Sequence, residues 1–507
     1  MSSRSKKILL LIFVAAAFLR FYDIGNVPPG LYGDEAMNGN NAVTALDNRD
    51  FKVFYEENNG REGLFINIQA LFLKSAEVLG IPNPREAWVL RAASAAFGTL
   101  TVLGIYFLMK ELFAAEGAAL FSSFLMATGF WHIVFSRIGF RAIMAPFFLV
   151  WGLYLLMLSL RRDNKWLPFA AGAVYGLGMH SYISYRATPL LIVIILALLG
   201  KSFGWKKILY RGTTFFAAAL IVFTPLGLYF LDNPGDFFGR TSDISVFNSP
   251  TPLKQITLNI LKTAGMFNVS GDWNPRHNIP GAPLLFWPVG ILFLIGLALT
   301  ITNALKNPKT ETINSKQFQN SNDSNPKSVS GFGHSNLGFR ILLLWLIITA
   351  LPVVISNEGI PHALRSILMI PTVFMIAALG GMRIYEFLKM GGSRMQSVAS
   401  FLFLTLLFLN AYQTYFLDWA KRTDVAEAFN VKYVKIAKEI NSLPNETPKY
   451  LILDTGGQDI RKIGSPAQTI MYLTDTYSLE KQKEKNVRFI TPKEIRTVPS
   501  GSFIFQL

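Results

Sequence analysis

The sequence predicts an α-helical membrane protein with about eleven transmembrane helices, followed by a small α/β domain. Three observations point to this class: 51% of the 507 residues are hydrophobic, only 16% are charged, and long apolar runs recur along the chain. A soluble protein is closer to a quarter charged. A hydrocarbon core of about 30 Å is crossed by about 20 apolar residues in a helix, and charged side chains are costly inside it.

The first apolar run, residues 7–24, follows a basic start and could be read as a signal peptide. No small-residue cleavage site follows it, so we interpret it as an uncleaved first span. The predicted spans are 7–24, 88–110, 116–135, 142–160, 166–183, 187–200, 212–231, 283–304, 340–356, 363–381 and 397–417.

The basic residues predict the orientation of these spans. The net charge is +16, and most Lys and Arg residues sit in short connections on one side when the N-terminus is cytoplasmic. An odd number of spans then leaves the C-terminus outside, and we expect the cell membrane as the location. Nucleic-acid binding is excluded because no basic, aromatic-interleaved soluble module is present. The absence of cysteine excludes disulfides, thiolate metal sites and cysteine nucleophiles.

The predicted membrane domain covers residues 1–420, and the α/β domain covers 421–507. Residues 25–87 form a first outer loop, in which helical spacing near 34–46 and over 61–80 predicts two amphipathic helices at the membrane surface. Residues 305–338 are rich in Asn, Ser and Lys, which predicts a disordered cytoplasmic loop. In the last domain an amphipathic helix is expected at its start, with strands at 449–454, 487–490 and 501–507.

Two adjacent acids, Asp34 and Glu35, stand close to the end of the first span. Asp is a favoured helix cap, so Asp34 could simply begin the helix that follows. A carboxylate at the boundary of the membrane could instead act as a base on a hydroxyl or amine nucleophile. Both interpretations remain open from the residues alone.

Further candidates are polar side chains near the expected outer face of the bundle. Arg137 and Arg141 are four residues apart and would share a helical face. Arginines hold anionic groups such as a lipid phosphate, but near span ends they also snorkel or pair with an acid. The remaining candidates are Arg61, Glu62, His180, Arg186, Asp272, Arg276, His277, His362 and Arg365.

An ordered series of segments resembles the GT-C glycosyltransferases over about residues 7–420. After the acid pair come "NGREGLFINIQALFL", "LRAASAAFGTLTVLGIYFL", "HIVFSRIGFRAIMAPFF" and "EGIPHALRSILMIP". They are similar to the bacterial and archaeal protein mannosyltransferase-like family, which includes the lipid A aminoarabinose transferases.

The resemblance implies a polyprenyl-phosphate-sugar donor and transfer on the outer face with inversion at the sugar carbon. Asp34 would be the catalytic aspartate, with Glu35 its neighbour in the motif. Relatives often carry a "KPP" stretch after polar residues of the second surface helix, where this chain has "REGL", so roles for Arg61 and Glu62 stay open. Phosphate contacts are expected from Arg137, Arg141, His362 and Arg365.

Some relatives employ a divalent metal, but this sequence has no compact ligand motif, so metal use is left open and no other cofactor is expected. The acceptor could be a protein, a lipid or a glycan. The main alternative function is a transporter or lipid flippase, which would usually show internal repeats and a polar midplane; neither is evident here. A binding or assembly protein that retains the scaffold is a further alternative, against which the intact acid pair argues.

Overall fold

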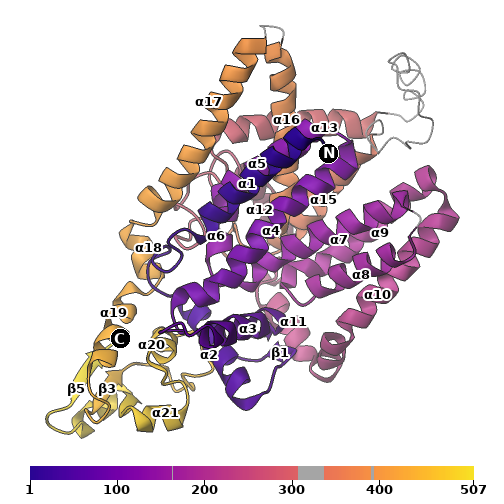
Figure 1. Cartoon of the computed structure of the whole chain (residues 1–507). Helices are drawn as coiled ribbons and strands as arrows, with labels where there is room; N and C mark the ends of the chain where they lie inside the picture. Colours follow the sequence, from indigo (N-terminus) through magenta and orange to yellow (C-terminus); the bar gives the residue numbers. More distant parts are fainter. Residues whose placement is uncertain (163, 307–335, 390–392) are drawn as a thin grey trace, which may run out of the picture.

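A computed structural model describes residues 1–507 except 163, 307–335 and 390–392. Most of the described chain is helical, and the longer helices form a bundle (Figure 1). The bundle contains α1 (Ser3–Phe21), α4 (Ala87–Phe113), α5 (Glu116–Thr128), α6 (Phe130–Arg137), α7 (Met144–Arg161), α8 (Trp166–Gly178), α9 (Thr188–Phe203), α10 (Trp205–Asp232), α13 (Trp287–Leu305), α15 (Leu337–Val354), α16 (Ile370–Lys389) and α17 (Ser393–Tyr412).

Shorter elements connect the bundle and build the last part of the chain. The shorter helices are α2 (Gly33–Asn48), α3 (Leu64–Val78), α11 (Pro234–Asp243), α12 (Pro252–Gly265), α18 (Thr423–Ala428), α19 (Val431–Ser442), α20 (Pro466–Thr474) and α21 (Leu479–Glu484). The short 3-10 helices are η1 (Arg141–Ile143), η2 (Ile183–Ala187), η3 (Val246–Asn248), η6 (Ile367–Met369) and η8 (Pro492–Thr497), and η7 (Gln413–Trp419) is a π-helix that continues α17. The strands are β1 (Phe54–Tyr55), β2 (Arg61–Glu62), β3 (Lys449–Ile452), β4 (Val487–Ile490) and β5 (Phe503–Gln506).

The membrane-spanning character of the chain is confirmed. Within the described residues, eight helices are long and apolar enough to cross a membrane, or nine if α5 and α6 form one span bent by 58°. All eleven predicted segments are helical, and α1 and α8 account for the difference in number. α1 carries several basic residues, and α8 has 13 residues, which is too short to cross at about 1.5 Å per residue. The number eleven therefore stays a prediction.

The bundle has one end that carries α2, α3 and residues 421–507, here called the domain end (Figure 1). The N-terminus lies at the opposite end. α3 exposes Leu71 and Val78, as expected for a helix at a membrane surface. In contrast, 10 of the 16 residues of α2 are buried, because α20 and α3 pack against it. α2 is therefore a helix of the first outer loop, as expected, and the last domain covers it.

The predicted α/β character of the C-terminal part is confirmed. β3 is the central strand of a parallel three-stranded sheet in the order β4-β3-β5. Its small core includes Ile440, Leu451, Ile470 and Val487. The expected amphipathic helix at its start is split into α18 and α19 by Asn430, which adopts a left-handed φ of 58°. The predicted loop over residues 305–338 falls largely outside the described residues.

Candidate active site

Asp34 lies in the first turn of α2 at the domain end. Its Oδ2 pairs with Arg61 Nη2 at 2.9 Å, and its Oδ1 accepts a hydrogen bond from Asn58 Nδ2 at 2.9 Å. Burial alone would raise the pKa of Asp34, but the Arg61 guanidinium, the Asn58 amide and the Arg276 charge together lower it below the ordinary value. The side chain is 25% exposed. Asp34 is therefore an ionised carboxylate that a reactant can still reach.

Glu35 has a different environment, although it is the next residue. Its carboxylate is fully buried and pairs with Arg91, with Nε to Oε1 at 2.9 Å and Nη2 to Oε2 at 3.2 Å. Backbone N–H groups of Gly139 and Tyr32 donate to the same carboxylate at 2.8 and 3.2 Å. Arg91 also donates to the carbonyls of Pro28 and Gly30. Glu35 thus joins α2, α4 and the chain before α2, and its hydrogen-bonding capacity is used in doing so.

The short strand β2 consists of Arg61 and Glu62 and pairs with β1 in an antiparallel register. Successive side chains of a strand point to opposite faces. Arg61 accordingly reaches Asp34, while Glu62 Oε2 pairs with Arg141 Nε at 2.8 Å and its Oε1 lies 3.5 Å from Arg186 Nη2. We call Glu62, Arg141 and Arg186 the arginine cluster. It carries a net positive charge, and β2 connects it to the Asp34–Arg61 pair.

Aromatic side chains support the arginine cluster. Arg141 lies over the Tyr182 ring at 5.7 Å from its centroid, and Arg186 lies 4.3 Å from the Phe237 centroid. His180 lies near the cluster, and its Nε2 donates to the Val222 carbonyl at 3.0 Å.

Two of the predicted phosphate contacts lie in other environments. Arg137 is fully buried, donates to the carbonyls of Leu19, Tyr22 and Val27, and lies over the Phe416 ring. The Arg365 side chain binds within its own loop, to the Ser356 hydroxyl and to Glu358. The sequence placed Arg137 and Arg141 on one helical face, but the chain leaves the helix between them: α6 ends at Arg137 and Arg141 begins η1.

His362 lies beside Asp272 and His277, which the sequence had identified only as separate polar residues. The ligating atoms of these three side chains all lie within 4.8 Å of one another. Burial alone would raise the pKa of Asp272, but the two histidines and the Asn274 backbone N–H lower it. Asn58, which binds Asp34, was missed altogether, because an Asn in a polar loop has no distinguishing pattern.

The last domain lies directly over Asp34. The Asn58 N–H donates to the Lys462 carbonyl at 3.0 Å, so the two loops are joined. A Cβ on Gly464 would lie 2.7 Å from Asp34 Oδ1 and 2.9 Å from Asn58 Nδ2. Only glycine fits this position without displacing the carboxylate or its partner. Residues 462–465 therefore form one wall of the candidate site.

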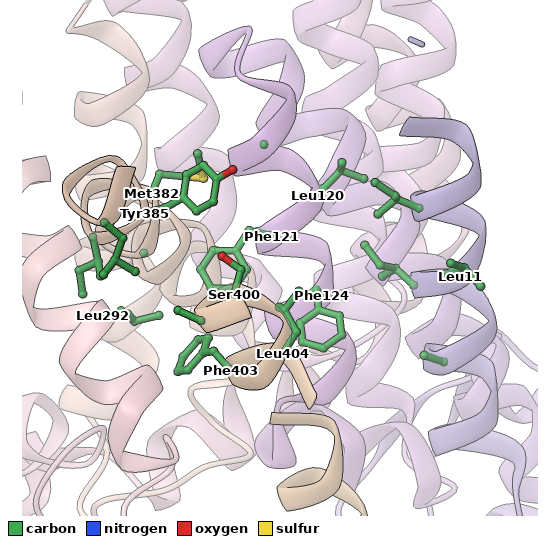
Figure 2. Close-up of a pocket in the computed structure, with 18 residues that line it drawn as sticks. Leu11, Leu120, Phe121, Phe124, Leu292, Met382, Tyr385, Ser400, Phe403 and Leu404 are labelled. Atoms are coloured by element: carbon green, nitrogen blue, oxygen red, sulfur yellow. The ribbon is translucent and has the colours of Figure 1, made fainter. Parts of the chain in front are cut away.

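A separate cavity of about 730 Å³ lies between α1, α5, α16 and α17, toward the end opposite the domain end. Figure 2 shows Leu11, Phe121, Phe124, Phe403 and Leu404 around it. Its lining residues carry no charge, and their few polar groups include the hydroxyls of Tyr385 and Ser400. Such a cavity suits a hydrocarbon chain and lacks the groups needed for acid–base chemistry.

Comparison with known proteins places this geometry in context. The profile of the dolichyl-phosphate-mannose-protein mannosyltransferase family matches residues 81–229. Comparison with curated proteins finds no match. The archaeal oligosaccharyltransferase AglB from Archaeoglobus fulgidus, solved with an inhibitory peptide and a dolichol-phosphate, aligns over 97% of this chain and 70% of its own, with a TM-score of 0.53 and 14% identity.

ArnT from Cupriavidus metallidurans, solved with undecaprenyl phosphate, aligns over 99% of this chain and 89% of its own, with a TM-score of 0.51 and 13% identity. Its apo structure aligns over 93% and 85% with a TM-score of 0.52. This chain has the GT-C glycosyltransferase fold. The fold class inferred from the sequence is thereby confirmed, and the profile match over 81–229 agrees with it.

Proposed function

We propose that the protein is a glycosyltransferase that moves a sugar from a polyprenyl-phosphate carrier to an acceptor nucleophile. The observation that carries this proposal is the position of β2, which lies between a candidate proton acceptor and a candidate anion-binding group. Arg61 holds the ionised Asp34 on one side, and Glu62 holds Arg141 and Arg186 on the other. A proton acceptor and an anion-stabilising group are the two parts that such a transfer needs. The solved neighbours with dolichol-phosphate and undecaprenyl phosphate support the choice of carrier.

In the proposed reaction the acceptor O–H or N–H gives its proton to Asp34. The acceptor atom forms a bond to the anomeric carbon, while the bond from that carbon to the phosphate oxygen breaks. The electron pair leaves with the phosphate, whose negative charge Arg141 and Arg186 stabilise. A single displacement of this kind inverts the configuration of the sugar carbon. Glu35 keeps α2 in place through Arg91 and takes no proton.

The low pKa of Asp34 affects the order of events. A carboxylate with a lowered pKa is a weak base, so it contributes little until the acceptor has begun to lose its proton. Departure of the phosphate must then be well advanced, with positive charge developing on the sugar ring as in other glycosyl transfers. The arginine cluster therefore supplies much of the rate acceleration in this proposal.

We further infer that the N-terminus is cytoplasmic and that the domain end faces the outside of the cell membrane. The basic connections between the spans support this orientation. The acceptor then meets Asp34 from the outer side, beside the wall formed by residues 462–465. The acceptor can be a protein, a lipid or a glycan.

The test is transfer by the purified full-length protein, incubated with a panel of polyprenyl-phosphate sugars and membrane extract and followed by mass spectrometry. Asp34→Asn should reduce transfer by roughly 100-fold to 10,000-fold, the usual contribution of a general base. Asp47→Asn is a matched control, because Asp47 lies exposed on the same helix. Near-normal transfer by Asp34→Asn would reject the proposed base.

A second pair of variants tests the anion-stabilising role. Arg186→Gln should weaken binding of the polyprenyl-phosphate product and lower transfer, while the protein remains folded. Arg162→Gln is its control, because Arg162 is an exposed arginine just after α7, which places it away from the cluster. Equal product binding by the native protein and Arg186→Gln would remove Arg186 from the phosphate site.

A further inference from the structure

Another cavity, of about 530 Å³, lies between the first outer loop and the last domain. Its volume falls within the range of about 300–1,000 Å³ that is typical of small-molecule sites. Three of its lining side chains are cationic and one is a carboxylate: Arg85, Lys449, Lys485 and Asp475. We propose that this cavity, here called the interdomain cavity, binds a saccharide through an anionic group of that saccharide, either a phosphate or a carboxylate.

The charges that line the interdomain cavity do not balance. Arg85 Nη2 pairs with Asp475 Oδ1 at 2.9 Å, and Lys485 Nζ lies 3.8 Å from Asp475 Oδ2. One carboxylate therefore serves two cations, and Lys449 adds a third. Burial lowers the pKa of Lys485, and the charge of Arg85 lowers it further, while Asp475 opposes this shift. Since Arg85 and Lys485 repel each other, a bound anion would be favoured between them.

Contacts within the last domain account for two of the three cations. Lys449 Nζ donates to three backbone carbonyls, which uses its whole donor capacity. Lys485 Nζ donates to the Thr474 carbonyl at 2.7 Å, at the end of α20. The last carbonyls of a helix lack partners within it, so Lys485 has a capping role there. These two lysines therefore contribute charge to the cavity and are held in place by the fold.

Arg85 has no comparable role. Within the part of the chain that the structure describes, Asp475 is the only hydrogen-bond or ion-pair partner of its side chain. Both side chains are 25% exposed, and a partly exposed pair contributes little to stability. A guanidinium has five N–H groups in a planar fork, which binds a phosphate or a carboxylate through two parallel hydrogen bonds. Arg85 is therefore the residue that we assign to the anion.

The other lining residues suit a sugar better than a bare inorganic ion. The side-chain amides of Asn83, Asn441 and Asn445 face the same cavity. An amide both donates and accepts hydrogen bonds, as sugar hydroxyls do. Ile440 and Val487 add apolar surface to the lining. A ligand with hydroxyls, C–H groups and one negative charge uses all three kinds of contact.

The interdomain cavity lies at the domain end, where we propose that the acceptor arrives. α20 begins next to the wall formed by residues 462–465 and ends with Thr474, which lines the cavity. Its nine residues span about 14 Å. A glycan of a few sugar units is long enough to reach from the wall to the cavity. We therefore assign the ligand to the acceptor, and this assignment rests on the proposed function, whereas binding of an anionic saccharide does not.

The test measures binding to the full-length protein in detergent by isothermal titration calorimetry. The probes are glucuronate, a glucose phosphate, neutral glucose and inorganic phosphate. The two charged sugars should bind more tightly than either glucose or inorganic phosphate. Arg85→Gln should weaken their binding by roughly 10-fold to 100-fold, the usual contribution of hydrogen bonds to a charged group. Arg85→Lys keeps the charge and loses the fork, so its affinity should lie between the two.

A variant of the acid gives a result in the opposite direction. Asp475→Asn removes the carboxylate that occupies Arg85, so the charged sugars should bind more tightly than to the native protein. A purely structural pair would not give this increase. Lys493→Gln is the matched control, because Lys493 is an exposed cation of η8 outside the cavity and should leave affinity unchanged. Melting curves establish that each variant is folded.

Equal binding of glucuronate and glucose by the native protein would overturn the proposal. The same affinity for glucuronate in the native protein, Arg85→Gln and Asp475→Asn would overturn it as well. Tighter binding of inorganic phosphate than of the charged sugars would reject a saccharide as the ligand. Transfer is measured separately, so a protein that binds glucuronate through Arg85 but transfers no sugar would reject the proposed transferase and leave this site in place.

Discussion

The neighbouring acids Asp34 and Glu35 lie in opposite environments, because Asp34 is partly exposed and Glu35 is fully buried. Glu35 and Arg91 form a fully buried ion pair with several additional hydrogen bonds. Removal of one partner of such a pair leaves the other charge buried and alone, at a cost of about 3–5 kcal/mol. Arg91→Gln should therefore lower the melting temperature in detergent markedly, and by more than Asp34→Asn, because Asp34 is partly exposed and its partner Arg61 keeps a hydrogen bond to Asn38 Oδ1. An unchanged melting temperature in Arg91→Gln would contradict the structural role of Glu35.

If Asp34 is the base of the proposed reaction, Arg61 sets the pH range in which it is ionised. Burial raises the pKa of Asp34, and Arg61 is the largest of the influences that lower it. Arg61→Gln should raise this pKa, so that activity is lost at a higher pH than in the native protein when the solution is acidified. The measurement is the acid limb of the kcat/KM profile. Lys52→Gln serves as the control, because Lys52 is an exposed cation in the same loop. An identical acid limb in Arg61→Gln would show that Arg61 does not tune Asp34.

At the residue scale, sequence reasoning selected Asp34 as a candidate because an acid beside a membrane span is costly and therefore conspicuous. It could not separate the role of Glu35, since Arg91 lies 56 residues away and the pairing depends on the fold. Arg137 was expected to contact a phosphate, but its guanidinium donates to three carbonyls of α1 and the segment after it. These partners also depend on the fold. Glu62 and Arg186 were candidates, but their contact across 124 residues required the structure.

At the scale of elements, α13 and α16 pack through two glycines. A Cβ on Gly296 would collide with the Ile376 carbonyl, and a Cβ on Gly380 would collide with the Leu292 carbonyl. Small residues of this kind let membrane helices approach closely. Gly380→Ala should cost about 1–3 kcal/mol, the usual cost of overpacking, and lower the melting temperature.

The control for this prediction is Gly235→Ala in α11, because no other atom lies within 4 Å of the position of its added Cβ. This variant should melt at the temperature of the native protein or slightly above, since alanine is the better helix former. If Gly380→Ala and Gly235→Ala melted together, the close contact between α13 and α16 would not limit stability.

Hydropathy predicted the helices well because lipid imposes one requirement on every span. It predicted the helix α2 but not its burial, because the covering helix α20 lies more than 400 residues later in the sequence. The apolar segment over 116–135 contained no sign of the bend between α5 and α6 beyond the glycine at position 129. The strands of the last domain were predicted from their β-branched and aromatic residues. These residues are enriched in strands, and here they contribute to one small core that belongs to this domain.

At the scale of the whole molecule, the proposed orientation has a direct test. The chain contains no cysteine, so one introduced cysteine is its only thiol. Glu480→Cys in α21 should react with a membrane-impermeant maleimide in intact cells, because Glu480 is exposed at the domain end. Ser202→Cys should react only after permeabilisation, since Ser202 is exposed near the far end of α9. The reverse pattern would place the candidate site in the cytoplasm.

The brevity of β2 has a consequence for anyone who wishes to alter this protein. Arg61 and Glu62 are consecutive, so the pleat of this one dipeptide sets the distance between Asp34, the proposed proton acceptor, and the arginine cluster, the proposed phosphate-binding group. One inserted residue between them would turn Glu62 to the face that now holds Arg61. A larger distance between Asp34 and Arg141, to admit a bulkier donor, would therefore require a shift of the whole of α2 or η1, and changes in the loop around β2 would not suffice.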